Sequence, residues 1–464
     1  MRIHLIGVCG TAMATLAALL QRRGHQVQGS DQHIYPPMSD FLREEGIRLL
    51  EGYHAEHVTE DVDLVVVGNA ISRGNPELES VLDRRVQYCS LPEAVREHFL
   101  REAQSIVLAG THGKTTTTAL TAWLLTHGGC DPGMLVGGIA RNFGERGTSY
   151  RVGSGPHFVI EGDEYDSAFF DKTAKFLKYL PQVAVIGNVE FDHADIYADF
   201  AAVQLAFRRL VNLVPRNGLL LLGADDAGAM ALVPFAVSPV ETFGLAEGAD
   251  WRATDVEAHD GITSFTVRHA GDEIGRFASP LLGHHNVRNA LAAIAVGQWA
   301  GVSAATLAEG LASFAGIKRR LEIVGQARGV TVIDDFAHHP TAVRETLAAL
   351  RSGYPDRRIW AVFEPRSASS CRRVFQDAFA EAFGHADEVI VAAVYRSSLP
   401  EEERLNAVRL VADLGRRGQH ARHIPDVPAI VETIASEARE GDVVMVMSNG
   451  GFGGIHGLLL TALR

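Results

Sequence analysis

The sequence predicts an α/β protein of three domains. At 464 residues the chain is about three times the length of an average domain. Wholly apolar strands such as residues 63–70 alternate with helical segments, a pattern typical of parallel sheets covered on both faces. Three blocks each open on such a strand, so we expect domains at residues 1–103, 104–315 and 316–464. The first and third should be doubly wound, Rossmann-like sheets, and the central sheet should be mostly parallel.

Composition and charge exclude several classes of protein. The net charge of −13 argues against nucleic-acid or lipid binding. No apolar run reaches the about 18 residues of a membrane span, and the start of the chain lacks the pattern of a signal peptide. The four cysteines lie far apart in the sequence and suit a reducing cytoplasm. We therefore expect a cytoplasmic protein with no membrane or nucleic-acid partner; monomer and weak dimer both remain open.

The first block opens as a nucleotide-binding half. Strand 3–8 leads into the turn "GVCGTAM", a helix over 11–23, and a second strand that ends at Asp31. The turn is similar to a dinucleotide fingerprint, but Met13 stands where the third glycine belongs. This favours another nucleotide diphosphate over NAD, and a purely structural turn remains an alternative.

The second block opens as a phosphate-binding loop. Strand 105–110 leads into "GTHGKTT" and a helix, so Gly110, Gly113, Lys114 and Thr115 occupy phosphate-loop positions. The usual first glycine is missing, because Leu108 stands there. Backbone N–H groups at a helix start bind phosphate oxygens, and the lysine and threonine suit the β/γ-phosphates and Mg²⁺. The strand–loop–helix context favours this over a capped glycine turn, and predicts a P-loop ATPase domain.

Acidic and imidazole side chains follow two later strands of the second block. "VIEGDEYD" places Glu161 at a strand end with Asp163 behind it, and "GNVEFDHADIY" places Glu190 and His193 likewise. Ligands of doubly wound sheets gather at the carboxyl ends of strands. Grouped near a phosphate loop, these groups suit Mg²⁺, although a single acid there would by default be a solvated or capping residue.

Two further motifs carry polar side chains. "GHHNVRNALAA" places Asn286 and Asn289 on one face of a helix start, where carboxamides can read an adenine edge or cap the helix. "DDFAHHP" (334–340) suggests zinc at first sight, but no cysteine and no further histidine at ligand spacing accompanies it. A loop that touches nucleotide or Mg²⁺ is favoured.

The remaining elements complete the three blocks. Residues 251–282 alternate apolar and polar residues and predict a small antiparallel piece, followed by helices over 284–301 and 304–316. The third block repeats the strand–helix rhythm through strands at 329–335, 358–363, 387–395 and 442–448. "AGIKRRLE" (315–322) is the expected hinge between the second and third domains.

Together these motifs strongly resemble the Mur ligase family over essentially the whole chain. These are ATP-dependent amide-forming enzymes of bacterial cell-wall synthesis, and "GTHGKTT" is the family's own shortened loop. The resemblance implies a UDP-binding first domain, a central ATPase domain and a closing third domain, with ATP and Mg²⁺ as cofactors. It also implies that ATP phosphorylates a carboxylate, and that the acyl phosphate then reacts with an amine.

The resemblance assigns roles residue by residue. Catalytic residues are Lys114, Glu161, His193 and Arg320, and metal ligands are Thr115, Glu161 and His193. ATP-binding residues are Gly110, Thr111, His112, Gly113, Lys114, Thr115, Thr116, His285, Asn286, Asn289, Arg320, Asp335 and His338. Substrate-binding residues are Thr11, Met13, Asp31, Asn69, Ala70, Ile71, Asp163, Arg366 and Asn449. In one departure from several members, the helix "FAAVQLAFRRL" has no lysine to carbamylate.

The branch within the family follows from five stretches. "GVCGTAM", "EGDEYD" and "DDFAHHPTAV" are similar to members that use UDP-N-acetylmuramate as the small-molecule donor. "FEPRSASSCRR" and the ending "MSNGGFGGIH" are similar to ligases that attach the tripeptide L-Ala-γ-D-Glu-meso-diaminopimelate during recycling, rather than L-alanine. The tripeptide is the expected acceptor and L-alanine the alternative. Met13 and the phosphate loop disfavour a dehydrogenase; Lys114, Glu161 and His193 disfavour a non-catalytic ATP-binding regulator.

Overall fold

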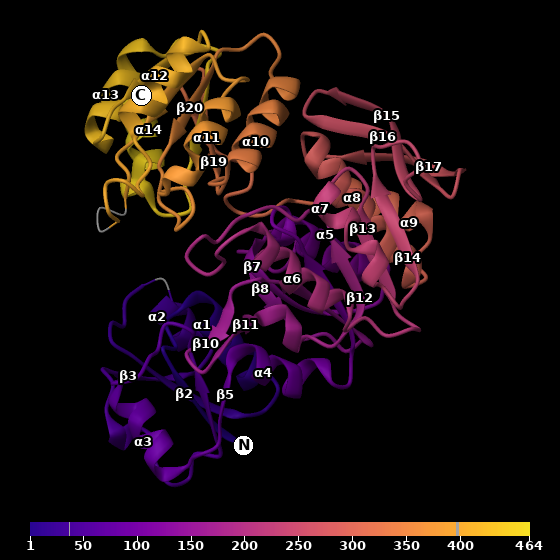
Figure 1. The fold of residues 1–464 in the computed structure, drawn as a ribbon, viewed down its shortest axis with the longest axis vertical. Helices are drawn as coiled ribbons and strands as arrows, with labels where there is room; N and C mark the ends of the chain where they lie inside the picture. Colours follow the sequence, from indigo (N-terminus) through magenta and orange to yellow (C-terminus); the bar gives the residue numbers. More distant parts are fainter. Residues whose placement is uncertain (37, 396–398) are drawn as a thin grey trace.

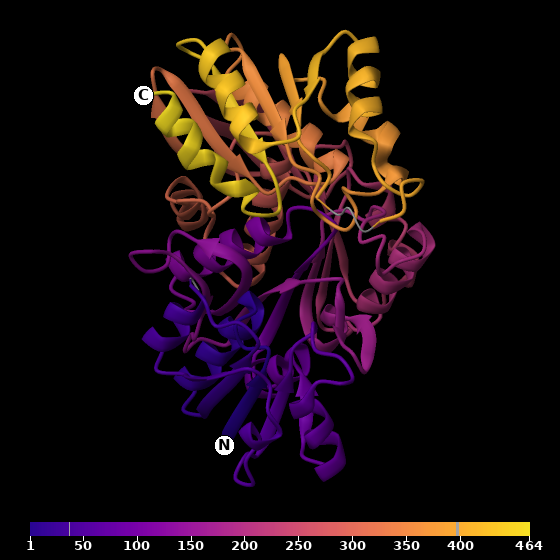
Figure 2. The ribbon, with the colours of Figure 1, turned by 90° about the vertical axis from the view of Figure 1, so that its left-hand side faces the viewer.

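The computed structural model describes residues 1–36, 38–395 and 399–464 and divides the chain into three lobes. Figures 1 and 2 show the N-terminal and C-terminal lobes at opposite ends of the long axis, both joined to the central lobe. Each lobe is built around its own sheet, so the predicted three-domain α/β class is confirmed. The predicted boundaries at 103 and 315 stay a prediction. The first falls between a strand that ends at Ser90 and the next strand, which begins at Gln104; the second falls between a helix that ends at Ala312 and a strand that begins at Glu322.

The N-terminal sheet is parallel throughout, in the order β3-β2-β1-β4-β5. Its elements are β1 (Arg2–Ile6), α1 (Thr11–Arg22), β2 (Gln26–Asp31), α2 (Met38–Glu44), β3 (Arg48–Glu51), β4 (Leu64–Val67), α3 (Pro76–Arg84), β5 (Tyr88–Ser90) and α4 (Leu91–Val95). β1 and β4 are almost wholly buried, as their continuous apolar runs predict.

The central sheet has the order β17-β16-β15-β14-β13-β12-β6-β9-β7-β8. Its strands are β6 (Gln104–Ala109), β7 (Gly133–Ala140), β8 (Thr148–Arg151), β9 (His157–Gly162), β12 (Pro181–Ile186), β13 (Leu219–Gly223), β14 (Val240–Gly244), β15 (Trp251–His259), β16 (Ile262–His269) and β17 (Asp272–Ser279). The helices are α5 (Lys114–His127), α6 (Phe200–Val211), α7 (Ala227–Met230), α8 (His284–Trp299) and α9 (Ala304–Ala312).

Antiparallel pairing is confined to the two edges of this sheet and to a separate hairpin. β15, β16 and β17 pair antiparallel, as the alternation in 251–282 predicts. The β7–β8 pair and the hairpin of β10 (Asp166–Ala168) and β11 (Asp171–Ala174) were not predicted from the sequence. The parallel centre β12-β6-β9 aligns three carboxyl ends at one edge of the sheet, which is what positions the site.

The C-terminal sheet has the order β18-β19-β23-β20-β21-β22, with only β18 antiparallel to its neighbour. Its strands are β18 (Glu322–Ala327), β19 (Val330–Asp335), β20 (Ile359–Phe363), β21 (Glu388–Val391), β22 (His420–His423) and β23 (Val443–Met447). Its helices are α10 (Pro340–Gly353), α11 (Gln376–Ala382), α12 (Ala407–Arg416), α13 (Val427–Glu437) and α14 (Ile455–Ala462).

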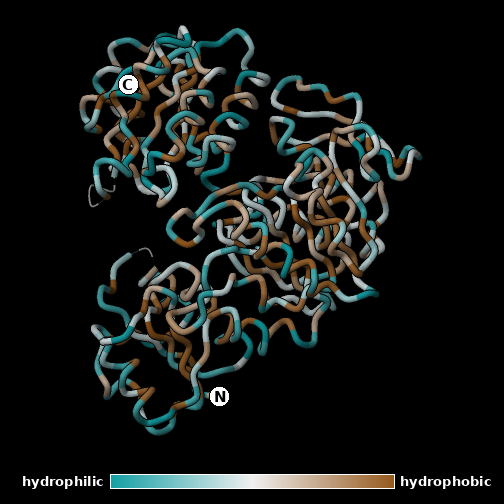
Figure 3. Tube along the Cα trace, in the orientation of Figure 1, coloured by the Kyte–Doolittle hydropathy of each residue, from teal (hydrophilic) through white to brown (hydrophobic). Residues whose placement is uncertain are grey.

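Apolar residues concentrate inside each lobe (Figure 3), and helices cover both faces of the doubly wound sheets. In the central lobe α5 and α8 pack on each other through buried alanine and leucine side chains. Within the described residues, no helix combines the length and the apolar character needed to cross a bilayer.

Candidate active site

The phosphate loop lies between the end of β6 and the start of α5, and its two glycines have positions that only glycine fills easily. Gly113 has φ +80°, and a Cβ there would lie 2.6 Å from Asn289 Oδ1. Gly110 has φ +131°, and a Cβ there would lie 3.2 Å from backbone atoms of Asn188 and Gly187. The loop is therefore pressed between the 187–188 turn and α8, which fixes the direction of its N–H groups.

Asn188 clamps the loop from the end of β12. Its Oδ1 accepts from the His112 backbone N–H at 2.7 Å, and its Nδ2 donates to the His112 carbonyl at 3.2 Å. Thr111 makes the neighbouring pair, since its hydroxyl donates to the Glu190 carbonyl and accepts from the Glu190 N–H. Sequence reasoning missed Asn188, whose only signal was its place directly after a buried strand.

Lys114 lies among three carboxylates, of which Glu164 is buried and Glu161 and Asp163 are half-buried. Its Nζ is 2.8 Å from Glu164 Oε2, and also donates to the carbonyls of Gly110 and Thr111. Burial alone would lower the pKa of Lys114, but the negative charges of Glu164, Asp163 and Glu161 outweigh burial and hold that pKa above its usual value. The lysine is therefore a fixed cation under the loop.

Glu164 links the lysine to the predicted histidine. Its Oε1 lies 3.0 Å from His193 Nε2, and Tyr197 donates its hydroxyl to the Glu164 carbonyl at 2.7 Å. Burial lowers the pKa of His193, but the hydrogen bond to Glu164 and the negative charges of Glu164 and Asp192 together outweigh burial and raise that pKa overall. The sequence placed Glu164 beside the site without a role; the structure makes it the shared partner of two predicted catalytic residues.

The Glu161 carboxylate and the Thr115 hydroxyl form a second hydrogen-bonded pair at the site. The Thr115 hydroxyl donates to Glu161 Oε1 at 2.9 Å, and the Gly137 N–H donates to Glu161 Oε2 at 2.6 Å. Burial raises the pKa of Glu161 despite these donors, so the carboxylate has less compensating charge than its burial demands. A hydroxyl and an under-compensated carboxylate side by side suit a hard cation.

The two consecutive arginines of the hinge have different roles. Arg320 Nη2 reaches Thr115 Oγ1 at 3.4 Å and its guanidinium lies over the Phe336 ring. Arg319 instead turns toward the C-terminal domain, where it contacts Asp334 and donates to the carbonyls of Ser448 and Gly450. Of the two, Arg320 is the one that contacts the phosphate loop, and its role toward the γ-phosphate stays a prediction.

One cavity of about 730 Å³ joins these groups. Most of the predicted ATP and metal residues line it, and so do two predicted substrate residues: Thr111, His112, Gly113, Lys114, Thr115, Thr116, Glu161, Asp163, His193, His285, Asn286, Asn289, Arg320, Asp335, His338 and Asn449. Gly110 lies just outside the lining. The contacts of each residue with ATP or metal stay a prediction, but their convergence from both domains is a property of the fold.

Several of these lining residues are held by the protein itself. Asn289 donates to Asn286 Oδ1 and accepts from the Thr117 hydroxyl, so the asparagine pair is locked in one orientation. Asp335 accepts from the N–H groups of Leu321 and Ala337, which ties the third-domain loop to the hinge. His285 is half-buried, and removal of its ring from solvent lowers its pKa to about 3.

The other predicted substrate residues lie outside this cavity, in two places. Thr11, Met13, Asp31, Asn69, Ala70 and Ile71 gather at the carboxyl ends of β1, β2 and β4 in the N-terminal domain. Asp31 accepts from the Cys9 N–H at 2.8 Å, and Asn69 donates to Asp166 of the central domain. Met13, which stands where the third glycine of the dinucleotide fingerprint belongs, is buried, and its Cγ would lie 3.5 Å from a Cβ on Gly68.

Arg366 forms the other group, at the end of β20. It lies over the Tyr395 ring, 3.7 Å from its centroid, and 3.6 Å from Glu364. A Cβ on Gly450 would overlap its guanidinium, so the 448–451 loop and Arg366 lie against each other. Asn449 of that loop reaches the cavity lining, while Arg366 does not.

Three family models match successive parts of the chain. Residues 2–102 match the "Mur ligase family, catalytic domain", residues 108–297 the "Mur ligase middle domain", and residues 319–450 the "Mur ligase, glutamate ligase domain". The chain belongs to the Mur ligase family.

Two relatives differ in the acceptor that their names give. The UDP-N-acetylmuramate–L-alanyl-γ-D-glutamyl-meso-2,6-diaminoheptandioate ligase of Escherichia coli K12 is 41% identical over 100% of this chain and 98% of its own. The UDP-N-acetylmuramate–L-alanine ligase of Geobacter sulfurreducens is 34% identical over 97% of this chain and 95% of its own.

Two solved structures cover nearly the whole chain. A murein peptide ligase from Psychrobacter arcticus is 37% identical with a TM-score of 0.72, covering 100% of this chain and 98% of its own. A UDP-N-acetylmuramate–alanine ligase from Thermotoga maritima is 27% identical with a TM-score of 0.80, covering 99% and 98%. The backbone comparison therefore does not separate the two acceptors, whereas sequence identity favours the peptide ligase.

Proposed function

We propose that this Mur ligase joins UDP-N-acetylmuramate to the tripeptide L-alanyl-γ-D-glutamyl-meso-diaminopimelate, with conversion of ATP to ADP and phosphate. The observation that carries the proposal is the 41% identity, over full length on both sides, to a relative named as that ligase. The cavity supports the reaction class, because the phosphate-loop lysine, half-buried carboxylates and a hinge arginine converge in it from two domains.

The chemistry follows from the charges in the cavity. A carboxylate is a poor electrophile, and phosphorylation of the lactyl carboxylate of the donor creates a good leaving group. Lys114 contacts the Gly110 carbonyl and Arg320 contacts the Thr115 hydroxyl, so both cations lie at the phosphate loop and can spread the charge of the transferring phosphoryl group. The amine of the acceptor then attacks the acyl carbon, the tetrahedral intermediate expels phosphate, and the amine loses its proton to give the amide.

The donor set around Thr115 fits Mg²⁺, the second cofactor of the proposal. Glu161 and the Thr115 hydroxyl offer adjacent oxygens, and His193 lies across the lysine, held by Glu164. Bound there, Mg²⁺ supplies charge neutralisation for the nucleotide phosphates. The remaining task of the protein is to position the reactants and exclude water, which would otherwise hydrolyse the acyl phosphate.

We expect the acceptor to extend from the acyl phosphate into the C-terminal domain, because residues of that domain, Asp335, His338 and Asn449, form part of the cavity lining. Arg366 and the 448–451 loop lie together at the ends of β20 and β23, and Asn449 of that loop lines the cavity. A guanidinium binds a carboxylate with two hydrogen bonds, and glycine N–H groups suit a second carboxylate.

A competition experiment tests the acceptor. The full-length protein receives UDP-N-acetylmuramate, ATP and Mg²⁺ with equimolar tripeptide and L-alanine, and products are resolved by mass. The tripeptide product should dominate. A predominant alanine product would reassign the enzyme to the L-alanine branch. Formation of neither product, with both acceptors present, would refute the ligase activity.

A further inference from the structure

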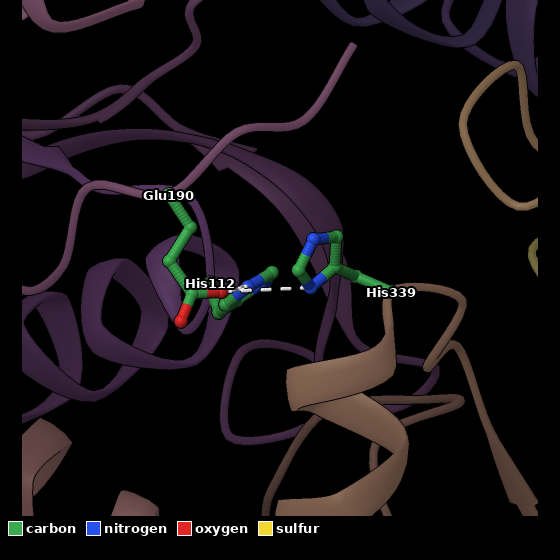
Figure 4. Close-up of side chains that lie close together, drawn as sticks. All are labelled: His112, Glu190 and His339. Atoms are coloured by element: carbon green, nitrogen blue, oxygen red, sulfur yellow. Dashed lines mark hydrogen bonds and ion pairs between the residues drawn. The ribbon is translucent and has the colours of Figure 1, made fainter. Parts of the chain in front are cut away.

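A histidine–glutamate–histidine cluster lies at the boundary of the central and C-terminal domains (Figure 4). His112 comes from the phosphate loop, Glu190 from the segment after β12, and His339 from the residue preceding α10. One ligand atom from each residue lies within 4.8 Å of the other two. Sequence reasoning disfavoured zinc at "DDFAHHP" for want of nearby ligands, but the missing ligands come from segments about 150 to 230 residues away.

The spacing of the ligand atoms is close to that of a tetrahedral metal site. His112 Nε2 lies 2.8 Å from Glu190 Oε2, and His339 Nδ1 lies 3.5 Å from the same oxygen. Metal–ligand bonds of about 2.0–2.1 Å in a tetrahedron place ligand atoms about 3.3 Å apart. Small side-chain rotations therefore bring the three atoms onto one ion.

The protonation state of His339 is fixed by its neighbours. Its Nε2 faces the Phe191 carbonyl at 3.1 Å, and a carbonyl can only accept, so Nε2 carries the hydrogen. Its Nδ1 accepts from the Thr341 backbone N–H at 3.3 Å and therefore carries no hydrogen, so a bound ion would replace that hydrogen bond on the same lone pair. A ligating histidine whose other nitrogen donates to a backbone carbonyl is the usual outer-shell arrangement of metal sites.

The other two ligands are also held in place before any ion arrives. Asn188 hydrogen-bonds to both the N–H and the carbonyl of His112, and the Thr111 hydroxyl accepts from the Glu190 N–H. The Thr341 hydroxyl donates to Glu190 Oε1 at 3.1 Å. For coordination, His112 must present Nε2, which lies 2.8 Å from Glu190 Oε2, without a proton on that atom. His112 and Glu190 line the cavity, which gives an ion access and a place for a fourth ligand.

We propose that His112, Glu190 and His339 bind a divalent transition-metal ion of the zinc type, separate from the predicted Mg²⁺ residues. Two imidazoles and one carboxylate favour zinc-like ions over magnesium, which prefers oxygen ligands. The bound ion ties the phosphate loop to the first turn of α10, and so holds the C-terminal domain against the central domain.

Metal titration of nucleotide-free, tag-free full-length protein tests the site. After treatment with chelator, Co²⁺ and Zn²⁺ are added separately, with visible absorption for Co²⁺ and calorimetry for Zn²⁺. The parent should bind one equivalent at this site with the absorption of four-coordinate cobalt. His339→Asn and Glu190→Gln should each raise Kd by more than the about 10- to 100-fold that an outer-shell partner costs.

The variants are chosen to keep the fold. Asparagine at 339 can still cap α10, as His339 does through Thr341 N–H, and glutamine at 190 still accepts from Thr341. His259→Asn is the matched control, because His259 is an exposed histidine beside an acid, Asp260, in the β15–β16 hairpin. It should bind like the parent.

Three results would overturn the proposal. One is a parent that takes up no Co²⁺ or Zn²⁺. The second is unchanged affinity in both His339→Asn and Glu190→Gln. The third is loss of binding in His193→Ala with retention in His339→Asn, which would place the ion at the predicted Mg²⁺ residues. None of these readouts depends on ligase activity, so the site can fail while the proposed function stands.

Discussion

Replacing Lys114 by methionine should damage stability and catalysis by separable amounts. The Nζ–Glu164 Oε2 contact of 2.8 Å joins side chains that are 12% and 2% exposed. Without the lysine, the carboxylates of Glu161, Asp163 and Glu164 lose their common cation. Removing one partner of a buried pair costs about 3–5 kcal/mol of folding free energy. Losing one preorganised cation at a transferring phosphoryl group costs about 2.7–4 kcal/mol, or about 10²–10³ in kcat.

The double variant Lys114→Met/Glu164→Gln separates the two losses. It removes both charges of the pair, so the melting temperature should return most of the way to that of the parent, while phosphate release stays low. Differential scanning fluorimetry and an ATP-dependent phosphate-release assay with both substrates give the two numbers. If kcat recovered together with stability, or if Lys114→Met turned over near the parent rate, the assignment of Lys114 to phosphoryl transfer would be wrong.

Three further substitutions probe other parts of the molecule. Gly113→Ala places a Cβ 2.6 Å from Asn289 Oδ1 at φ +80°, so KM for ATP should rise; an unchanged KM would show that the loop can relax. Arg366→Ala should raise KM for the tripeptide about ten- to a hundredfold, which corresponds to about 1.5–3 kcal/mol, without changing KM for ATP. Equal tripeptide kinetics in parent and variant would remove Arg366 from the acceptor site. Glu77→Gln tests the buried His4–Glu77–His57 network: burial raises the pKa of Glu77, but hydrogen bonds from His4, Ser30 and His57 outweigh it and lower the pKa below its usual value. That carboxylate therefore stabilises the fold above pH about 4.3, and this contribution is lost as the pH falls through the pKa of the folded state. The melting temperature of the parent should therefore fall more steeply on acidification than that of Glu77→Gln. Parallel curves of melting temperature against pH would contradict this.

Much of the fold could be predicted from the sequence because its strongest patterns are local. The apolar strands at 105–110, 157–163 and 182–189 all form, and their adjacency in the sheet brings Lys114, Glu161 and His193 together. The edge pairs β7–β8 and β10–β11 escaped prediction. β7 carries three glycines and little alternation, and the strands of β10–β11 are only three and four residues long.

The roles that sequence reasoning missed depend on contacts between distant segments. Arg319 and Arg320 are equivalent in the sequence, and only their different hydrogen-bond partners, the Ser448 carbonyl and the Thr115 hydroxyl, separate a hinge contact from a phosphate-loop contact. Glu164 gains its role from Lys114 and His193, which lie 50 and 29 positions away. The cluster of His112, Glu190 and His339 likewise exists only once two domains meet.

An oxygen-transfer experiment asks whether the reaction passes through an acyl phosphate. UDP-N-acetylmuramate labelled with ¹⁸O in its lactyl carboxylate is incubated with ATP, Mg²⁺, tripeptide and the full-length protein. Formation of an acyl phosphate transfers one carboxylate oxygen to the phosphate that leaves when the amine attacks. We therefore expect each released phosphate to carry one labelled oxygen, in step with tripeptide product and ADP. Unlabelled phosphate, or AMP in place of ADP, would contradict this route.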